Sequence, residues 1–207
     1  MEPVDFNPAR HEYRKNGVLV PSVTQVLARS GRIDYSYVQE EIRSYSMSRG
    51  QSVHWLTQLE DEGALDYRRV PRNLRGYRKA WKDWKCCSGF QPLWVERRFI
   101  SHYGYGGTID RTGTFPSGTS GFCYPMAVVD IKSAEKEGQV ADWIRFQLCA
   151  YCLGVIGTPS LARTIRRIAV RLCANGSYRV KEWPLSTWDS DFAEFIRDLQ
   201  KCKNAER

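Results

Sequence analysis

The spacing of the apolar residues changes near residue 90, and this change limits the folds open to the chain. Before it, apolar side chains recur every three or four positions, as on one face of a helix. After it, runs rich in β-branched and aromatic residues predict strands. The sequence therefore predicts an α/β fold with a mixed central sheet flanked by helices. Its 207 residues suit a single domain, 1–207, with a mostly helical part at about 1–90 and a sheet-containing core at about 91–207.

Local signals divide the first ninety residues into a hairpin and three helical stretches. Asn16-Gly17 indicates a turn within a hairpin over residues 13–20. Ser22 followed by Gln25 is a capping-box pattern, which predicts that a helix begins there. Further helices are expected over about 37–62, where Gly50 should mark a bend or a close helix contact, and from residue 71 to residue 88.

The sheet-containing core is predicted to alternate strands with helices. Asn175-Gly176 is the strongest hairpin signal in the chain. Asp189 or Ser190 is expected to cap the last helix. The other elements expected are strands at 93–101, 105–115 and 124–133, a loop at 116–121, a helix at 138–156, and strands at 165–173 and 178–183.

A net charge of +8 favours an anionic partner, either nucleic acid or a membrane surface. No apolar run approaches the roughly 20 residues that cross a bilayer, and the first ten residues lack the apolar stretch of a signal peptide. The seven cysteines are irregularly spaced, which favours reduced thiols. We therefore expect a cytoplasmic protein, of a bacterial cell or encoded by a phage, with no membrane and no obligate protein partner.

Two acids and a lysine stand out in the predicted strands. Asp130 and Lys132 are two positions apart in a run of apolar residues, so their side chains point to the same side of the sheet. A hairpin would bring Asp110 beside Asp130. Adjacent carboxylates repel each other unless a cation such as Mg²⁺ lies between them. On these residues alone, a surface ion pair and an unrelated turn aspartate explain the pattern equally well.

Gln147 and Tyr151 lie four apart on the helix that follows, so they share one face of it. Their polar ends would reach a phosphate near the Asp130 strand. As a lone pair they fit an exposed glutamine and a partly buried tyrosine at least as well.

In order and spacing, five motifs resemble the RecB-like branch of the PD-(D/E)XK nuclease superfamily. Three form the expected centre: GGTID at 106–110, VDIK at 129–132 and QLCAY at 147–151. Upstream, RGQSVH at 49–54 resembles the family's helix with a metal-binding histidine. PSVTQVL at 21–27 resembles the opening segment of phage-type exonucleases and of the mitochondrial genome maintenance exonuclease.

The resemblance implies a restriction-endonuclease-like core and a Mg²⁺ or Mn²⁺ centre. Its metal ligands would be His54, Asp110, Asp130 and the Ile131 carbonyl. Lys132 would orient or deprotonate the attacking water, while Gln147 and Tyr151 would hold the DNA backbone. Protonation of His54 near its reference pKa of about 6.5 would then compete with the metal.

The implied activity is a metal-dependent exonuclease on single-stranded or free-ended DNA, in phage replication, recombination or repair. A structure-selective endonuclease is the alternative within the class, and a catalytically inactive DNA-binding module the alternative outside it. Intact Asp110, Asp130 and Lys132 argue against the inactive module, because pure binding needs no acids that repel phosphate.

Three further predictions concern DNA and metal binding. Glu96 could face the same cleft, although Arg97 and Arg98 offer it an ordinary salt bridge. A basic and aromatic stripe suits single-stranded DNA, the alternative being that its aromatics are core; it comprises Arg72, Arg75, Arg78, Lys79 and Lys82 with Tyr77 and Trp81. Cys149 and Cys152 have no second pair at metal-site spacing, so no zinc site is expected. Some RecB-like nucleases hold an iron-sulfur cluster through a close downstream cysteine trio, but Cys173 and Cys202 are too scattered for one, so no cluster is expected.

Overall fold

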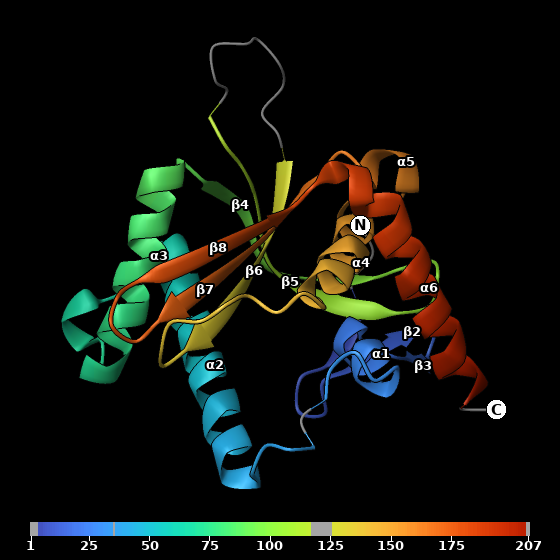
Figure 1. Cartoon of the computed structure of the whole chain (residues 1–207), viewed down its shortest axis with the longest axis horizontal. Helices are drawn as coiled ribbons and strands as arrows, with labels where there is room; N and C mark the ends of the chain where they lie inside the picture. The colour runs from blue at the N-terminus through green and yellow to red at the C-terminus, as the bar shows by residue number, and fades with distance from the viewer. Residues whose placement is uncertain (1–3, 35, 117–125, 206–207) are drawn as a thin grey trace.

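The computed structural model describes residues 4–34, 36–116 and 126–205. Helices pack on a five-stranded sheet, and a smaller three-stranded sheet lies near the N-terminus (Figure 1). The large sheet is formed by β4 (Gln91–Ile100), β5 (Gly106–Thr114), β6 (Met126–Ala134), β7 (Arg166–Cys173) and β8 (Tyr178–Trp183). The longer helices are α2 (Glu40–Asp61), α3 (Arg75–Ser88), α4 (Ile144–Ile156) and α6 (Trp188–Asn204).

The five-stranded sheet is mixed, in the order β4-β5-β6-β7-β8. Neighbouring strands are antiparallel except for β6 and β7, which run parallel. A parallel pair needs a crossover connection, and here α4 and the short α5 (Pro159–Ala162) lie within it. The prediction of an α/β fold with a mixed sheet flanked by helices is therefore confirmed.

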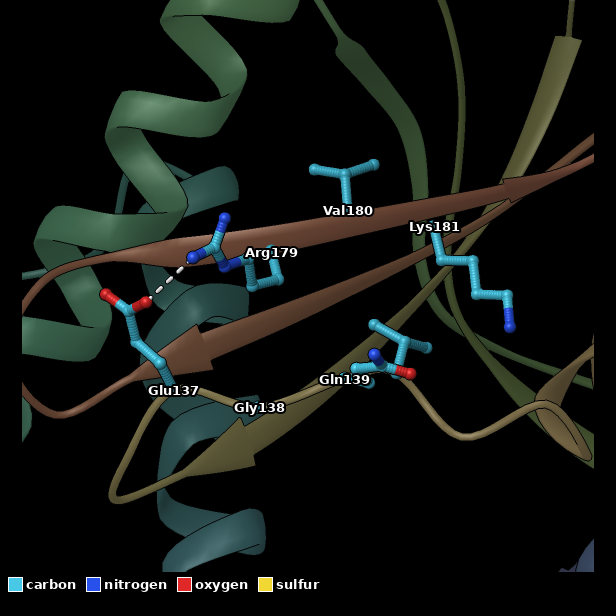
Figure 2. A pocket seen from close by; sticks show the side chains of 7 residues that line it. Glu137, Gly138, Gln139, Arg179, Val180 and Lys181 are labelled. Carbon is cyan, nitrogen blue, oxygen red and sulfur yellow. Dashed lines mark hydrogen bonds and ion pairs between the residues drawn. The ribbon is translucent and has the colours of Figure 1, made fainter.

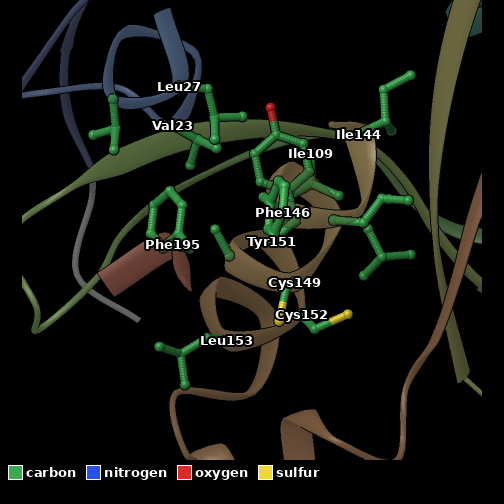
Figure 3. Packing of buried hydrophobic residues seen from close by; sticks show 14 of the residues in the cluster. Val23, Leu27, Ile109, Ile144, Phe146, Cys149, Tyr151, Cys152, Leu153 and Phe195 are labelled. Carbon is green, nitrogen blue, oxygen red and sulfur yellow. The ribbon is translucent and has the colours of Figure 1, made fainter. Parts of the chain in front are cut away.

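Helices cover both faces of this sheet (Figure 1), and a hydrophobic core lies on each face. On one face, α2 and α3 cover the β6 side chains of Val129 and Ile131. On the other face, α4 and α6 pack with Val128 and with α1 (Val23–Arg29) (Figure 3). Helix α4 is buried around most of its circumference, whereas the N-terminal half of α2 projects past the sheet into solvent (Figure 1).

The N-terminal sheet and α1 attach to the start of β5. The sheet consists of β1 (Asp5–Asn7), β2 (Glu12–Lys15) and β3 (Val18–Val20). Ser22 and Gln25 form the predicted capping box. The Gly106 amide donates to the Pro21 carbonyl, and a Cβ at Gly106 would lie 2.6 Å from the Tyr13 ring. A glycine is therefore needed where the hairpin meets β5.

Several element boundaries differ from the sequence-based prediction. Helix α4 begins at Ile144 rather than near 138, and α6 begins at Trp188, one residue before the predicted cap. Two 3₁₀ turns, η1 (Tyr67–Arg69) and η2 (Arg72–Leu74), precede α3, so this α-helix begins at Arg75 rather than at Pro71. β1 and α5 were not predicted, because three- and four-residue elements are too short to show a period.

Three other sequence-based predictions, for Gly50, for the loop at 116–121 and for membrane spans, have different outcomes. Gly50 makes no close helix contact, since a Cβ there would meet only the Ser133 hydroxyl, 3.8 Å away. Apart from Pro116, the predicted loop at 116–121 lies outside the described residues. No helix in the described part of the chain is both long and apolar enough to cross a membrane. A third 3₁₀ turn, η3 (Leu185–Thr187), precedes α6.

Candidate metal centre

Strands β5 and β6 part at the centre of the sheet, and we call this point the strand fork. Their pairing runs from Thr114 opposite Met126 to Arg111 opposite Val129 and stops there. Beyond it, Asp110 Oδ2 accepts a 2.6 Å hydrogen bond from the Ile131 amide. His54 Nε2 on α2 lies 3.0 Å from the Ile131 carbonyl oxygen. Two side chains thus bind the backbone groups that a continued β5 would have bound.

Three side chains converge in the strand fork as a candidate metal group: His54, Glu96 and Asp110. Each offers one ligand atom, and these atoms all lie within 4.8 Å of one another. His54 Nδ1 is 3.4 Å from Glu96 Oε1 and 3.6 Å from Asp110 Oδ1. Carboxylate oxygens with one imidazole nitrogen form a donor set that could bind a divalent metal ion.

Glu96 has an unusual backbone for a strand residue. Its φ is 47°, a left-handed conformation that non-glycine residues rarely adopt, and it lies inside β4. The pairs on either side of it, Val95 with Arg111 and Arg97 with Ile109, place it opposite Asp110. Such conformations cost roughly 1–3 kcal/mol and persist where the surroundings enforce them. Here the conformation directs a carboxylate toward His54.

The charges of the strand fork shift each other's protonation. Burial lowers the pKa of His54, but the Asp110 and Glu96 carboxylates outweigh burial and raise the pKa to about 9. Burial raises the pKa of Asp110 to about 6, with a further contribution from Asp130 and opposition from His54. At neutral pH the metal-free site therefore holds a protonated imidazole facing two carboxylates. A metal ion must displace that proton to bind the nitrogen.

Asp130 and Lys132 lie on the α4 face of the sheet, where a chain of hydrogen bonds links them to that helix. Lys132 Nζ lies 2.9 Å from Asp130 Oδ1 and 3.4 Å from Gln147 Oε1. The Gln147 amide donates to the Tyr151 hydroxyl at 2.8 Å. Only 1% of Asp130 is exposed, so this is not a surface ion pair.

The sequence predicts Asp130 as a metal ligand, but Asp130 is not one of the three residues of the metal group. Glu96, for which the sequence also offers an ordinary salt bridge, is one of them. However, Asp130 Oδ2 is buried and has no hydrogen-bond partner among the described residues. A buried carboxylate oxygen without a partner is costly, and a cation in the strand fork would satisfy it.

Behind the metal group lies a buried arginine that sequence reasoning missed. Arg111 is fully buried and donates to Asp61 at 2.6 Å, to Glu96 at 3.1 Å and to Thr57 at 2.9 Å. The Trp81 indole donates to the same Asp61 carboxylate. Arg111 thus joins α2 to the sheet and holds Glu96 in place. An arginine directly after Asp110, in a strand otherwise made mostly of glycine, threonine and isoleucine, was the available signal.

Hollows open on both sides of the strand fork. One, of about 340 Å³, is bordered by Glu96, Asp110 and Arg98 together with the N-terminal hairpin. The other, of about 490 Å³, is bordered by His54, Lys132 and the projecting half of α2. A larger groove of about 650 Å³ lies at the β8 edge, between Glu137 and Lys181 (Figure 2). It contains none of the metal group and offers no comparable chemistry.

The aromatic members of the basic stripe are not available to DNA. Tyr77 and Trp81 are 2% and 0% exposed, so the prediction that they stack on bases is wrong, and they belong to the core between α3 and the sheet. Of the cations, Arg78 pairs with Glu60 and Lys79 with Asp83. Arg72, Arg75 and Lys82 are exposed, and Arg75 donates to the Val70 carbonyl.

Cys149 and Cys152 lie in the core on the α4 face of the sheet. Both are fully buried in α4, and burial raises the pKa of the Cys152 thiol to about 12. Neither is a member of the metal group.

No protein-family model matches the chain, and no curated protein is significantly similar to it. The strand fork is therefore the feature of the molecule that points to a function.

Proposed function

We propose that this chain is a divalent-metal-dependent deoxyribonuclease with a restriction-endonuclease-like core, acting on single-stranded or free-ended DNA. One observation supports the proposal most. Buried acids, a histidine and a lysine meet where two strands part, next to hollows that open to solvent. Their order along the chain also resembles that of RecB-like nucleases.

The donor set fits a metal ion that is hard or of intermediate softness, such as Mg²⁺ or Mn²⁺. His54, Glu96 and Asp110 would hold it, with Asp130 Oδ2 and the Ile131 carbonyl as neighbouring oxygens. When bound, such an ion polarises a phosphoryl oxygen and acidifies a water molecule. A site that presents only carboxylates would repel phosphate, so the cation also makes substrate binding possible.

Lys132 is placed to act on the reacting groups. Its ammonium lies beside Asp130 and borders the 490 Å³ hollow, so it can orient the attacking water and offset negative charge on the phosphate in the transition state. Gln147 and Tyr151 are 3% and 5% exposed. Their hydrogen bonds hold the lysine toward the strand fork, which makes them positioning residues rather than primary DNA contacts.

The test is hydrolysis of end-labelled linear and closed circular DNA with Mg²⁺, with Mn²⁺ and with EDTA. We expect metal-dependent loss of the linear substrate, abolished by EDTA and by Asp110→Asn. Asp189→Asn is the matched control, because Asp189 is exposed at the start of α6, borders neither hollow and is not in the metal group.

Each other outcome has a defined meaning. Cleavage of the closed circle would favour the structure-selective endonuclease over the exonuclease. Salt-sensitive DNA binding without cleavage in any metal would favour the inactive binding module. Cleavage that persists in Asp110→Asn would disprove the proposed site.

A further inference from the structure

Gly50 occupies a position in α2 where packing does not require a glycine. A Cβ at Gly76 of α3 would lie 1.8 Å from the Ala174 carbonyl oxygen, and one at Gly154 of α4 would lie 2.5 Å from the Phe99 ring. At Gly50 the nearest heavy atom is the Ser133 hydroxyl at 3.8 Å, and the helix continues through it with ordinary φ. Glycine is the poorest helix former after proline. Its presence at residue 50 therefore needs another reason.

The space beside Gly50 is the 490 Å³ hollow that borders the metal group. The same hollow is lined by His54, Ile131 and Lys132 of the strand fork. Its size lies within the roughly 300–1,000 Å³ range of small-molecule sites. A group seated there would be in direct continuity with a phosphate held at the metal.

The far wall of this hollow has the chemistry of a base-binding site. Val38 and Met47 offer apolar surface, and Arg43 and Arg49 bring guanidinium groups. Arg49 pairs with Glu135 at 3.2 Å, yet its Nε is buried without a hydrogen-bond partner in the described residues. A nucleobase presents an apolar face together with hydrogen-bonding edges, which matches this combination.

We propose that this hollow, the Gly50 pocket, takes the base of one unpaired nucleotide next to the scissile phosphate, and that it stays open because residue 50 carries no bulky side chain. The inference rests on the proposed nuclease function and deepens it. A base inside the pocket cannot remain paired and stacked in a duplex. The pocket therefore selects single-stranded DNA or a strand end that has been unpaired.

The direct test is to fill the pocket without disturbing the metal group. Side chains on a helix lean toward its N-terminus, so the side chain in Gly50→Leu leans toward Ser46 and Met47 and away from His54. Gly50→Ala is the matched control, because its single methyl group meets only ordinary contact distances. Both variants should fold, since either residue favours helix over glycine.

Binding is measured as fluorescence anisotropy of a labelled single-stranded oligothymidylate, with Ca²⁺ replacing the catalytic metal. We expect Gly50→Ala to bind like wild type and Gly50→Leu to bind about tenfold more weakly, within the range for losing one base contact. An abasic residue placed at successive positions of the oligonucleotide should weaken wild-type binding at one position by a similar factor. That abasic effect should be absent in Gly50→Leu.

The outcomes separate this proposal from the nuclease function. Equal binding by Gly50→Leu and Gly50→Ala, with wild type active on DNA, would overturn the Gly50 pocket alone. Reduced Mn²⁺ affinity in Gly50→Leu would assign its effect to His54 and would also count against the pocket. Failure of the wild type to bind or cleave single-stranded DNA would overturn both proposals.

Discussion

The strand fork and helix α3 both combine charged with apolar residues in the sequence, but the structure treats their charges in opposite ways. In α3 the aromatics are buried and most of the cations face solvent. In the strand fork the charges themselves are buried: Asp110, Asp130 and Arg111 are 7%, 1% and 0% exposed. Burying charge is costly even when each group has a partner.

The difference indicates which region is explained by folding alone. Helix α3 follows the common rule of apolar side chains inside and charges outside, so its stripe needs no ligand to account for it. The strand fork has a strained glutamate, a partnerless carboxylate oxygen and a histidine facing two acids. Features of this kind concentrate where proteins bind ligands or carry out chemistry.

The largest expected effect is on turnover, from changes in the strand fork. Asp110→Asn keeps the acceptor for the Ile131 amide but removes a charge from the metal group. Lys132→Ala removes the ammonium and leaves the ligands. We expect each to lower kcat at least roughly 10²–10³-fold. Mn²⁺ titration should show weaker binding only for Asp110→Asn.

The control for the lysine is Lys201→Ala, on the exposed face of α6. Wild-type turnover in Lys132→Ala would mean that Lys132 only pairs with Asp130 and takes no part in catalysis.

The second prediction concerns the stability of the α3 core. Trp81→Ala empties the space of a fully buried side chain and removes the indole donor to Asp61, so we expect a loss of roughly 3–5 kcal/mol in the free energy of unfolding. Urea denaturation measures this loss. Tyr67→Ala, at a position 61% exposed, should change stability little.

DNA affinity per folded molecule should be unchanged in Trp81→Ala. A large loss of affinity for single-stranded DNA without a loss of stability would instead indicate that Trp81 stacks on DNA bases.

The third prediction is a pH dependence of metal affinity. The pKa of His54 is raised to about 9, so below that pH each bound metal ion must displace one proton. Mn²⁺ affinity should therefore rise about tenfold per pH unit between pH 6 and 9, then level off. This window lies above the decline near pH 6.5 that the sequence suggested. Below pH 6, protonation of Asp110 steepens the fall.

Calorimetric titration in buffers of different ionisation enthalpy counts the released protons. His54→Ala should abolish most of the dependence above pH 6, and His102→Ala, at an exposed position, should not. A flat affinity over this range in the wild type would take His54 out of the metal group.

The fourth prediction compares two substitutions of Glu96. Both Glu96→Ala and Glu96→Gly remove the carboxylate and should weaken Mn²⁺ binding to the same extent. Only glycine accepts a φ of 47° without strain, so Glu96→Gly should be more stable than Glu96→Ala by roughly 1 kcal/mol. Thermal unfolding of the metal-free proteins gives this difference. Equal stabilities would show that the backbone relaxes when the carboxylate is lost.

The smallest expected effect belongs to two exposed cations, Arg72 of η2 and Lys82 of α3. Changing Arg72 and Lys82 together to Gln should reduce the slope of log affinity against log salt by at most roughly 1.4 for single-stranded DNA. Binding measured over a range of salt concentrations gives that slope. An unchanged slope would mean that these cations are exposed to solvent and do not contact DNA. Changing Lys201 and Lys203, both exposed on α6, to Gln controls for the same loss of net charge.

Local signals account for the elements that the sequence predicted well. The Asn16-Gly17 turn, the Ser22 capping box and the Asn175-Gly176 hairpin each depend on interactions within a few residues, and the structure confirms all three. Helix starts were less accurate, since the apolar spacing around Val140 extends the helical pattern into a loop. Periodicity alone does not show where a helix begins.

The parts of the site that could not be predicted depend on contacts between distant residues. Nothing near Glu96 in the sequence shows its left-handed backbone or its place opposite Asp110. The Arg111 to Asp61 pair joins residues 50 positions apart, and only the packed fold brings them together. For Trp81 the sequence predicted a DNA-binding surface where the structure has core. An aromatic residue at helical spacing beside cations fits a core as well as a DNA surface.

The contact between His54 and the Ile131 carbonyl joins positions 77 residues apart in the chain. A metal ion held by His54, Glu96 and Asp110 next to that contact would act as a reversible cross-link between α2 and strands β4 and β5. The unfolded chain has no equivalent site, so saturating metal favours the native state by about 2.7 kcal/mol at a hundred times its Kd. Depletion of the metal would thus shorten the lifetime of the folded protein as well as stop its chemistry, which couples its abundance to the supply of the ion.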